Sequence, residues 1–216
     1  MIEVPAAIVG AVTREVRSGS RDGTPTRIAI ARRTYRTDPD DLWDALTNAE
    51  RLPRWFLPIT GELHVGGRYQ LHGNAGGVIE RCEPPTSFAV TWEMGPMVSW
   101  LAVTLRADGG GTTLELAHEA PVDPDRWTQY GPSAVGIGWD LSLMALGLHI
   151  ESGAPVDPEE AAAFTLSPTG IEFAQMASSS WAAAAIADGD DAAAAHEAAA
   201  RTVAFYTVVP DSGAGD

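Results

Sequence analysis

The chain has 216 residues, of which 45% are hydrophobic and 20% charged, and its formal net charge at pH 7 is -15. This length and composition are typical of a soluble globular protein that buries one sizeable core and has room for an appendage. A nucleic-acid partner is not expected, because the sequence offers no basic face to neutralise phosphates. The acidic excess is strongest over residues 153–216, where ten acids face a single Arg.

Targeting and redox signals are weak. The N-terminal apolar stretch, residues 4–12, is interrupted by Pro5 and Gly10 and carries no basic run, so it does not read as a signal peptide. No continuous apolar run reaches the ~18 residues of a membrane span. The single cysteine, Cys82, excludes an intrachain disulfide and a cysteine-based metal cluster, and we predict it to be a small buried residue in a strand. We therefore expect a cytoplasmic protein with no membrane partner.

Residues 9–17 and 26–35 are β-rich and flank a turn-rich segment, which predicts a hairpin. Asp38 and Pro39 are an N-cap and a first-turn residue, so a helix is predicted from 39 to about 48, with a second short helix from about 49 to 55. A meandering antiparallel sheet is predicted from strands at about 61–66, 67–73, 77–83, 87–94, 97–107 and 112–120.

A long helix is predicted over residues 132–152, with an apolar stripe suited to lying across a curved sheet. The stripe consists of Val135, Trp139, Leu143, Leu146 and Ile150. Beyond a linker at 155–157 the chain is Ala-rich, and helices are predicted at about 158–165, 168–187 and 190–207. These predictions give a helix-grip region, residues 1–152, and a helical C-terminal extension, residues 153–216.

Several short segments lie within about residues 27–152: Asp44–Asn48, Arg54–Phe56, Gly66–Tyr69, Ile79–Pro85 and Phe88–Trp92, with the apolar helix around Trp139. Together they resemble the SRPBCC superfamily, the helix-grip fold of START and birch-pollen-allergen-like domains. Within it they are similar to the bacterial branch related to the activator of heat-shock-protein-90 ATPase. The resemblance implies an α+β fold in which a curved antiparallel sheet wraps a long helix, here with an added N-terminal strand. These segments are structural marks and carry no catalytic signature.

Alternation along the predicted strands assigns one face to Phe88, Val90 and Trp92, to Leu101, Val103 and Leu105, and to Leu114, Leu116 and His118. If that face meets the long helix, an apolar pocket forms between them, and such pockets bind apolar or aromatic ligands. The alternative is a solidly filled core. The predicted ligand-binding residues are Trp92, Leu101, Val103, Leu116, His118, Trp139 and Leu143.

Other candidate chemistry is weak. Glu119 follows His118 directly, so the two side chains should point to opposite faces of a strand and cannot form a catalytic dyad. The remaining histidines lack a zinc-binding spacing, and neither metal nor cofactor is expected. Gly136 and Gly138 are expected to be structural, or else to leave room for a bound molecule. Three arginines, Arg54, Arg68 and Arg81, are either solvated charges or contacts for a ligand carboxylate at the pocket mouth.

Three functions remain open. The first is a non-catalytic carrier or sensor of a small apolar or aromatic ligand, as the resemblance implies. The second is an enzyme of the polyketide cyclase or aromatase kind, which would need an acid and a base in the pocket. The third is a chaperone-associated role, which the family name alone suggests. The eukaryotic activator has a further N-terminal domain, so the name does not by itself assign that role to this chain. A homodimer is also expected, with Trp181, Phe205 and Tyr206 as anchors of the helical extension.

Overall fold

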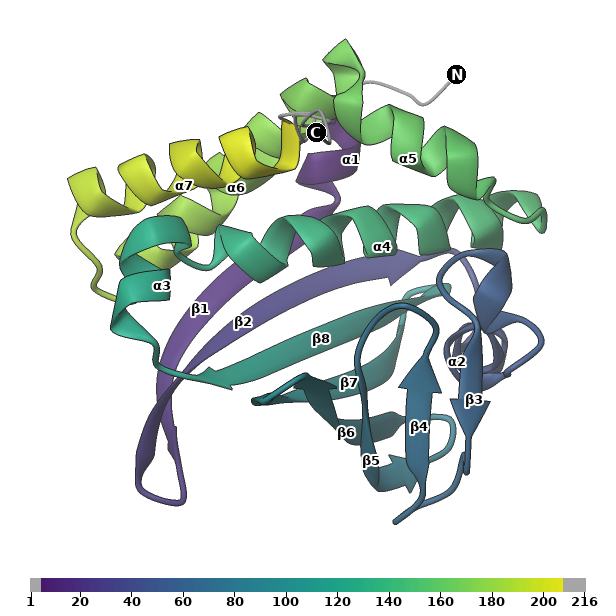
Figure 1. The fold of residues 1–216 in the computed structure, drawn as a ribbon. Coiled ribbons are helices and arrows are strands. Elements are labelled where there is room, and N and C mark those ends of the chain that lie inside the picture. The colour runs from purple at the N-terminus through teal and green to yellow at the C-terminus, as the bar shows by residue number, and fades with distance from the viewer. Residues whose placement is uncertain (1–4, 208–216) are drawn as a thin grey trace, which may run out of the picture.

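The fold was examined in a computed structural model, which describes residues 5–207. Its framework is an eight-stranded, wholly antiparallel sheet in the order β1-β2-β8-β7-β6-β5-β4-β3. The sheet curves, and the helix α4 (Ser133–Ser152) lies across its concave face (Figure 1). This is the predicted helix-grip architecture, and the core lies between the sheet and α4.

The chain begins with a short helix, α1 (Pro5–Gly10), which the sequence did not lead us to expect. The hairpin of β1 (Val12–Arg21) and β2 (Thr24–Tyr35) follows, so the first strand starts three residues later than predicted. Asp22 and Gly23 connect the strands with φ angles of 51° and 79°. Positive φ at both central positions is the requirement of the tight turn that matches strand twist.

The helix α2 (Pro39–Thr47) begins where predicted, because the Asp38 carboxylate accepts a hydrogen bond from the Asp41 N–H. The second short helix is reduced to a single 3-10 turn, η1 (Leu52–Arg54). The strand predicted at 61–66 is wrong: β3 is Ile59–Gly61, and residues 62–67 form a loop that leads into β4 (Arg68–Leu71).

The remaining strands are β5 (Gly76–Glu83), β6 (Ser87–Met94), β7 (Met97–Asp108) and β8 (Gly111–Pro121), close to the predicted bounds. A register shift interrupts the pairing of β5 with β6 between Ile79 and Arg81. Such a bulge changes which side chains share a face of the strand. Cys82 lies just beyond the bulge and was predicted to be buried, but it is exposed.

A further unpredicted helix, α3 (Pro124–Tyr130), leads into α4. The start of α4 was predicted to within one residue, and its end is capped by Gly153 in the left-handed conformation, with φ of 66°. Leu143 and Leu146 are buried, as expected for the gripping stripe, and Trp139 and Ile150 pack against the same core. Val135 was assigned to this stripe wrongly, because its side chain is 40% exposed.

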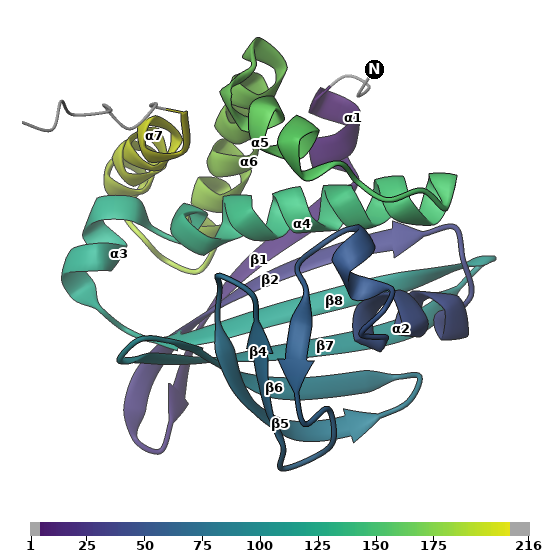
Figure 2. The same cartoon turned by 45° about the vertical axis from the view of Figure 1, so that its right-hand side comes forward.

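The helical extension consists of α5 (Pro158–Leu166), α6 (Pro168–Ala187) and α7 (Ala192–Thr207). It packs on the outer side of α4, so that α4 lies between the sheet and a second helical layer (Figure 2). Trp181 of α6 is fully buried where α6 meets α4. A Cβ atom on Gly136 would lie 2.3 Å from its indole nitrogen. Gly136 therefore makes room for Trp181 and not for a bound molecule.

A buried ion pair joins three of these elements. Asp140 of α4 accepts hydrogen bonds at Oδ2 from Arg14 Nε of β1, at 3.1 Å, and from Trp181 Nε1 of α6, at 2.9 Å. The Arg14 and Asp140 side chains are 4% and 1% exposed. Removal of the Asp140 carboxylate from water raises its pKa, and the nearby Arg14 guanidinium partly offsets that rise.

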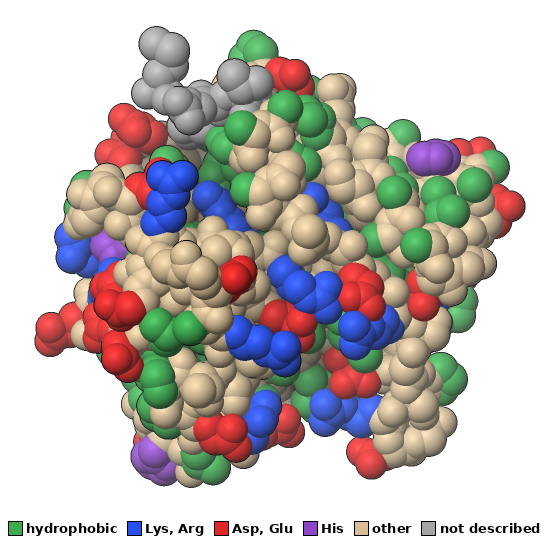
Figure 3. Space-filling model, turned by 180° about the vertical axis from the view of Figure 1, so that it is seen from behind, with side chains coloured by type: hydrophobic (Ala, Val, Ile, Leu, Met, Phe, Trp, Pro, Cys, Tyr) green, Lys and Arg blue, Asp and Glu red, His purple; other side chains and the backbone are tan. Residues whose placement is uncertain are grey.

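The outer face of the sheet is charged but not basic. Arg32 bridges Glu15 and Glu115 across three strands, and Arg21 pairs with Glu119. Seen from behind, basic and acidic side chains alternate across the middle of the molecule (Figure 3). Within residues 5–207, α4 is the helix whose length and apolar composition would allow it to cross a membrane, and 56% of its most apolar window is buried inside the protein.

Candidate ligand pocket

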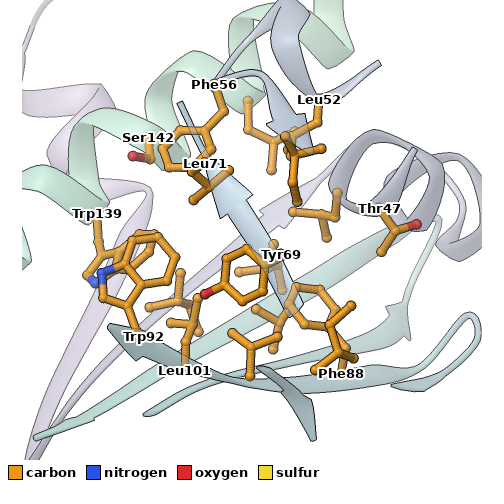
Figure 4. Close-up of a pocket in the computed structure, with 18 of the residues that line it drawn as sticks. Thr47, Leu52, Phe56, Tyr69, Leu71, Phe88, Trp92, Leu101, Trp139 and Ser142 are labelled. Atoms are coloured by element: carbon orange, nitrogen blue, oxygen red, sulfur yellow. The ribbon is translucent and has the colours of Figure 1, made fainter. Parts of the chain in front are cut away.

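A cavity of about 170 Å³ lies between the concave face of the sheet and α4. Figure 4 shows side chains from both layers, and from α2 and η1, pointing into it. None of its lining residues is ionised. The lining comprises Leu46, Thr47, Leu52, Trp55, Phe56, Ile59, Leu63, Tyr69, Leu71, Ile79, Cys82, Phe88, Val90, Trp92, Leu101, Val103, Leu114, Leu116, Trp139, Ser142, Leu143 and Leu146.

Regular periodicity explains two of the walls. On α4, residues 139, 142, 143 and 146 fall at spacings of three and four, which brings them to the face that looks onto the sheet. On β6, β7 and β8, alternate residues share the concave face, as predicted. Six of the seven predicted ligand-binding residues line the cavity: Trp92, Leu101, Val103, Leu116, Trp139 and Leu143. The seventh, His118, lies behind Trp139.

The third wall was missed in the sequence, because it comes from segments without a clear period. Trp55 and Phe56 follow η1 and stack on each other with ring centroids 5.4 Å apart. The indole N–H of Trp55 donates to the Ala45 carbonyl of α2 at 2.8 Å, which holds this loop against α2. Tyr69 of β4 belongs to this wall, and Phe88, which alternation along its strand had assigned to the concave face, completes the aromatic lining. The aromatic character of Trp55, Phe56 and Tyr69 was the available signal, but where these residues meet depends on long-range strand order.

The three hydroxyl groups in the lining are already hydrogen-bonded to the protein backbone. Tyr69 Oη donates to the Thr91 carbonyl at 2.8 Å, and Thr47 Oγ1 donates to the Trp43 carbonyl at 2.8 Å. Ser142 Oγ donates to the Gly138 carbonyl at 2.9 Å, within α4. Because these donors are satisfied internally, the cavity presents an apolar surface to any occupant.

His118 is bound on both sides of its ring. The indole Nε1–H of Trp139 donates to His118 Nδ1 at 2.9 Å, so Nδ1 is the acceptor and the ring proton is on Nε2. Nε2–H then donates to Ser99 Oγ at 2.8 Å, and Ser99 Oγ–H donates to the Trp92 carbonyl at 3.0 Å. One chain of hydrogen bonds therefore connects Trp139 with the backbone of Trp92.

The surroundings of His118 do not suit general base catalysis. Burial lowers the pKa of His118 to about 4, which makes it a weak base at neutral pH. Glu119 points to the other face of the sheet, as predicted, where it accepts hydrogen bonds from Arg21 and Thr26. The neutral imidazole instead positions Trp139.

Two lining residues are exposed to solvent and mark where the cavity opens. Leu63, 42% exposed, belongs to the loop between β3 and β4. The exposed Cys82 lies on β5 beyond the bulge and lines the same cavity as Ile79, three residues earlier. Residues three apart on a regular strand point to opposite faces, so this shared position fits the bulge.

The three arginines considered as contacts for a ligand carboxylate already interact with other groups of the protein. Arg54 Nη2 donates to the Gly153 carbonyl at 2.7 Å. Arg68 pairs with Glu93 at 2.5 Å, and Arg81 lies 3.6 Å from Glu83. Across residues 5–207, no group of three His, Cys, Asp or Glu side chains has a metal-binding arrangement.

Comparison with known proteins places this geometry in a family. Residues 36–151 match the family described as Activator of Hsp90 ATPase homolog 1-like protein. The solution NMR structure of CalU16 from Micromonospora echinospora is 32% identical, with a TM-score of 0.70, over 83% of this chain and 97% of that chain. No curated protein sequence matches the chain.

Two further solved structures are similar to this chain. The crystal structure of CalU16 is 30% identical, with a TM-score of 0.65, over 81% of this chain and 98% of that chain. Protein MLL2253 from Mesorhizobium loti is 22% identical, with a TM-score of 0.51, over 58% of this chain and 97% of that chain, and it supports the fold alone. The CalU16 likeness extends beyond residues 36–151, so it includes part of what lies outside the family segment.

Proposed function

Because the chain belongs to the family of Activator of Hsp90 ATPase homolog 1-like proteins, whose fold it shares, we propose that it binds a small apolar or aromatic molecule in the cavity beneath α4. In this proposal the protein is a carrier or sensor and performs no chemistry on its ligand. It acts in the cytoplasm, without a metal, a cofactor, a nucleic acid or a membrane as partner.

One observation carries the proposal. The cavity of about 170 Å³ is lined mostly by apolar and aromatic side chains, and the hydroxyl groups in its lining are bonded to the protein's own backbone. Transfer of the apolar surface of a ligand from water into such a cavity is favourable, by roughly 25 cal/mol per Å². It offers no charge to neutralise an ionised ligand.

The first experiment uses N-phenyl-1-naphthylamine, a neutral fluorescent probe of apolar sites. We expect saturable binding with one site per chain. Val103→Phe should fill the cavity and weaken binding at least tenfold, because Val103 lines it. Leu105→Phe is the matched control, since Leu105 is buried on the same strand but lies outside the lining. Equal binding by both variants would contradict the proposal.

A second experiment uses the thiol at the opening. Cys82 is the single cysteine and is exposed, so a maleimide reagent should label it stoichiometrically. Saturation with the bound probe should slow labelling, because Cys82 lines the cavity. Native mass spectrometry of protein purified from its own host would then identify a co-purifying molecule and its class.

The cyclase or aromatase alternative has less support. It requires a convergent acid and base, and the histidine beside the cavity, His118, has both ring nitrogens in hydrogen bonds within the protein. A chaperone-associated role rests on the family's name. Stimulation of a heat-shock-protein-90 ATPase by the purified chain would favour that role over ours.

The homodimer stays a prediction, with fewer anchors than the sequence suggested. Trp181 is buried within the chain, and Tyr206 Oη donates to the Ala134 carbonyl of α4 at 3.0 Å. Phe205 alone of the three is exposed, at 69%. Light scattering of the full chain and of Phe205→Ser distinguishes a monomer from a dimer. A dimer whose interface includes Phe205 should dissociate in the variant.

A further inference from the structure

We propose that Trp139, held in place by His118, determines the length of the ligand that the pocket accepts, and that the enclosed part of this ligand is neutral and apolar. The inference rests on the proposed function, since it concerns the occupant of the same cavity. It assigns a positioning role to His118 and a specificity-determining role to Trp139.

The two indoles close one end of the cavity. Trp92 and Trp139 lie edge to face with their ring centroids 5.1 Å apart. Figure 4 shows them together at one end of the lining residues, whereas Thr47 and Phe88 lie at the other end. A ligand extending along the cavity toward this end therefore meets an indole ring.

The hydrogen-bond chain fixes this wall. Rotation of Trp139 out of its position would leave His118 Nδ1 without its donor in a site where His118 is 7% exposed. The same chain reaches the Trp92 carbonyl through Ser99, so the backbone that carries the second indole is held from the same point. The wall is therefore built into the fold and does not need a ligand to order it.

The direction of the hydrogen bond from Trp139 also determines which ligand groups suit this end of the cavity. Its N–H points toward His118 and is used there, which leaves the carbon part of the ring to face the cavity. Because the lining hydroxyls of Thr47, Tyr69 and Ser142 also donate to backbone carbonyls, an enclosed hydroxyl, amide or carboxylate would lose its water without gaining these groups as donors. Polar groups of the ligand belong at the opening.

The test is a homologous series of neutral 1-alkanols, measured by displacement of N-phenyl-1-naphthylamine. Affinity should rise about fourfold with each added CH2, the transfer value of one buried methylene, and should stop rising at a cutoff length. Trp139→Ala should move the cutoff to longer alkanols, as should Trp139→Leu, which keeps more apolar volume if the first variant folds poorly. Trp127→Ala is the matched control, because Trp127 does not line the cavity.

His118 is tested by its acceptor. His118→Gln retains an acceptor for the Trp139 N–H, so the cutoff length should stay unchanged. His118→Val removes that acceptor, so the cutoff should become gradual or move to longer alkanols. An unchanged cutoff in both Trp139 variants, or a wild-type protein without a cutoff, would overturn the inference. Failure of every neutral probe to bind the wild-type protein would instead refute the proposed function.

Discussion

The two nitrogens of His118 are both engaged while its imidazole is neutral, which makes the protein sensitive to acid. Protonation of Nδ1 would turn the Trp139 N–H and the ring into two facing donors. The pKa of His118 is about 4 in the folded protein, against about 6.5 in an unfolded chain. The unfolded state therefore binds more protons below pH 6.5, and stability falls as the pH decreases from 6.5 to 4.

We expect this group to remove up to about 3 kcal/mol of unfolding free energy over that range, at about 1.4 kcal/mol per unit of pKa difference. The measurement is chemical denaturation of the wild type and His118→Gln at several pH values. The difference between their free energies should narrow toward low pH, because carboxylates that titrate in both proteins cancel. Parallel pH profiles would contradict the depressed pKa.

Two glycines in the first turns of α4 offer a second test at the scale of single residues. A Cβ on Gly136 would overlap the Trp181 indole at 2.3 Å, whereas a Cβ on Gly138 meets only the Tyr206 hydroxyl at 3.4 Å. Gly136→Ala should therefore destabilise by roughly 1–3 kcal/mol, as overpacking does. Gly138→Ala should be close to neutral, because the contact with the Tyr206 hydroxyl costs little and the preference of a helix for Ala over Gly, about 1 kcal/mol, offsets it. Thermal unfolding of the pair measures the contrast.

At the scale of elements, the buried ion pair is the main polar link between β1, α4 and α6. Removing one partner leaves a charge without compensation in the interior, which typically costs about 3–5 kcal/mol. We expect that loss for Asp140→Ala. Replacing both residues, as Arg14→Met with Asp140→Leu, should cost clearly less than the sum of the single replacements. A double-mutant cycle in denaturant measures the coupling, and simple additivity would show that the pair contributes no coupling energy.

Elements with a strong local signal were predictable. Asp38 with Pro39 began α2, and the stripe through Trp139 and Leu143 identified the gripping helix and one wall of the pocket. Short elements were not: α1 has six residues and α3 seven, too few for a hydrophobic period to appear, although Asp123 and Pro124 are an N-cap and a first-turn residue. Cys82 was predicted to be buried because free cysteines usually are, but this tendency of the residue type does not show that Cys82 lies at the opening of the cavity.

The remaining part of the site depends on tertiary contacts. The sequence left open that Gly136 makes space for a ligand, but which residue occupies that space depends on where α6 docks, some forty residues later in the chain. Trp181 takes the position beside Gly136, and the residues of α4 that line the cavity begin farther along the helix, at Trp139. In the same way, Trp55 and Phe56 became pocket residues only through the packing of their loop on α2.

For the whole molecule, the packing argues against independence of the helical extension. Ile137 and Met144 on the outer side of α4 are buried in a cluster with Phe164 and Phe173 of the extension. We therefore expect a truncation after Gly153 to lose its folded state, because truncating one buried Trp already costs about 3–5 kcal/mol and whole domains have about 5–15. Near-ultraviolet circular dichroism measures this outcome. A truncated protein with a native spectrum would support the division at residue 152 instead.

The close pair of indoles at the end of the pocket also has an optical consequence. Two indole transitions whose ring centroids are 5.1 Å apart, with planes inclined at 63°, couple as excitons and give a circular dichroism band of paired sign. That band depends on the relative orientation of Trp92 and Trp139 and on little else in the fold. The intensity of the couplet therefore reports directly whether the wall is assembled, without any added label, and ligand titrations or acidification can be followed through it.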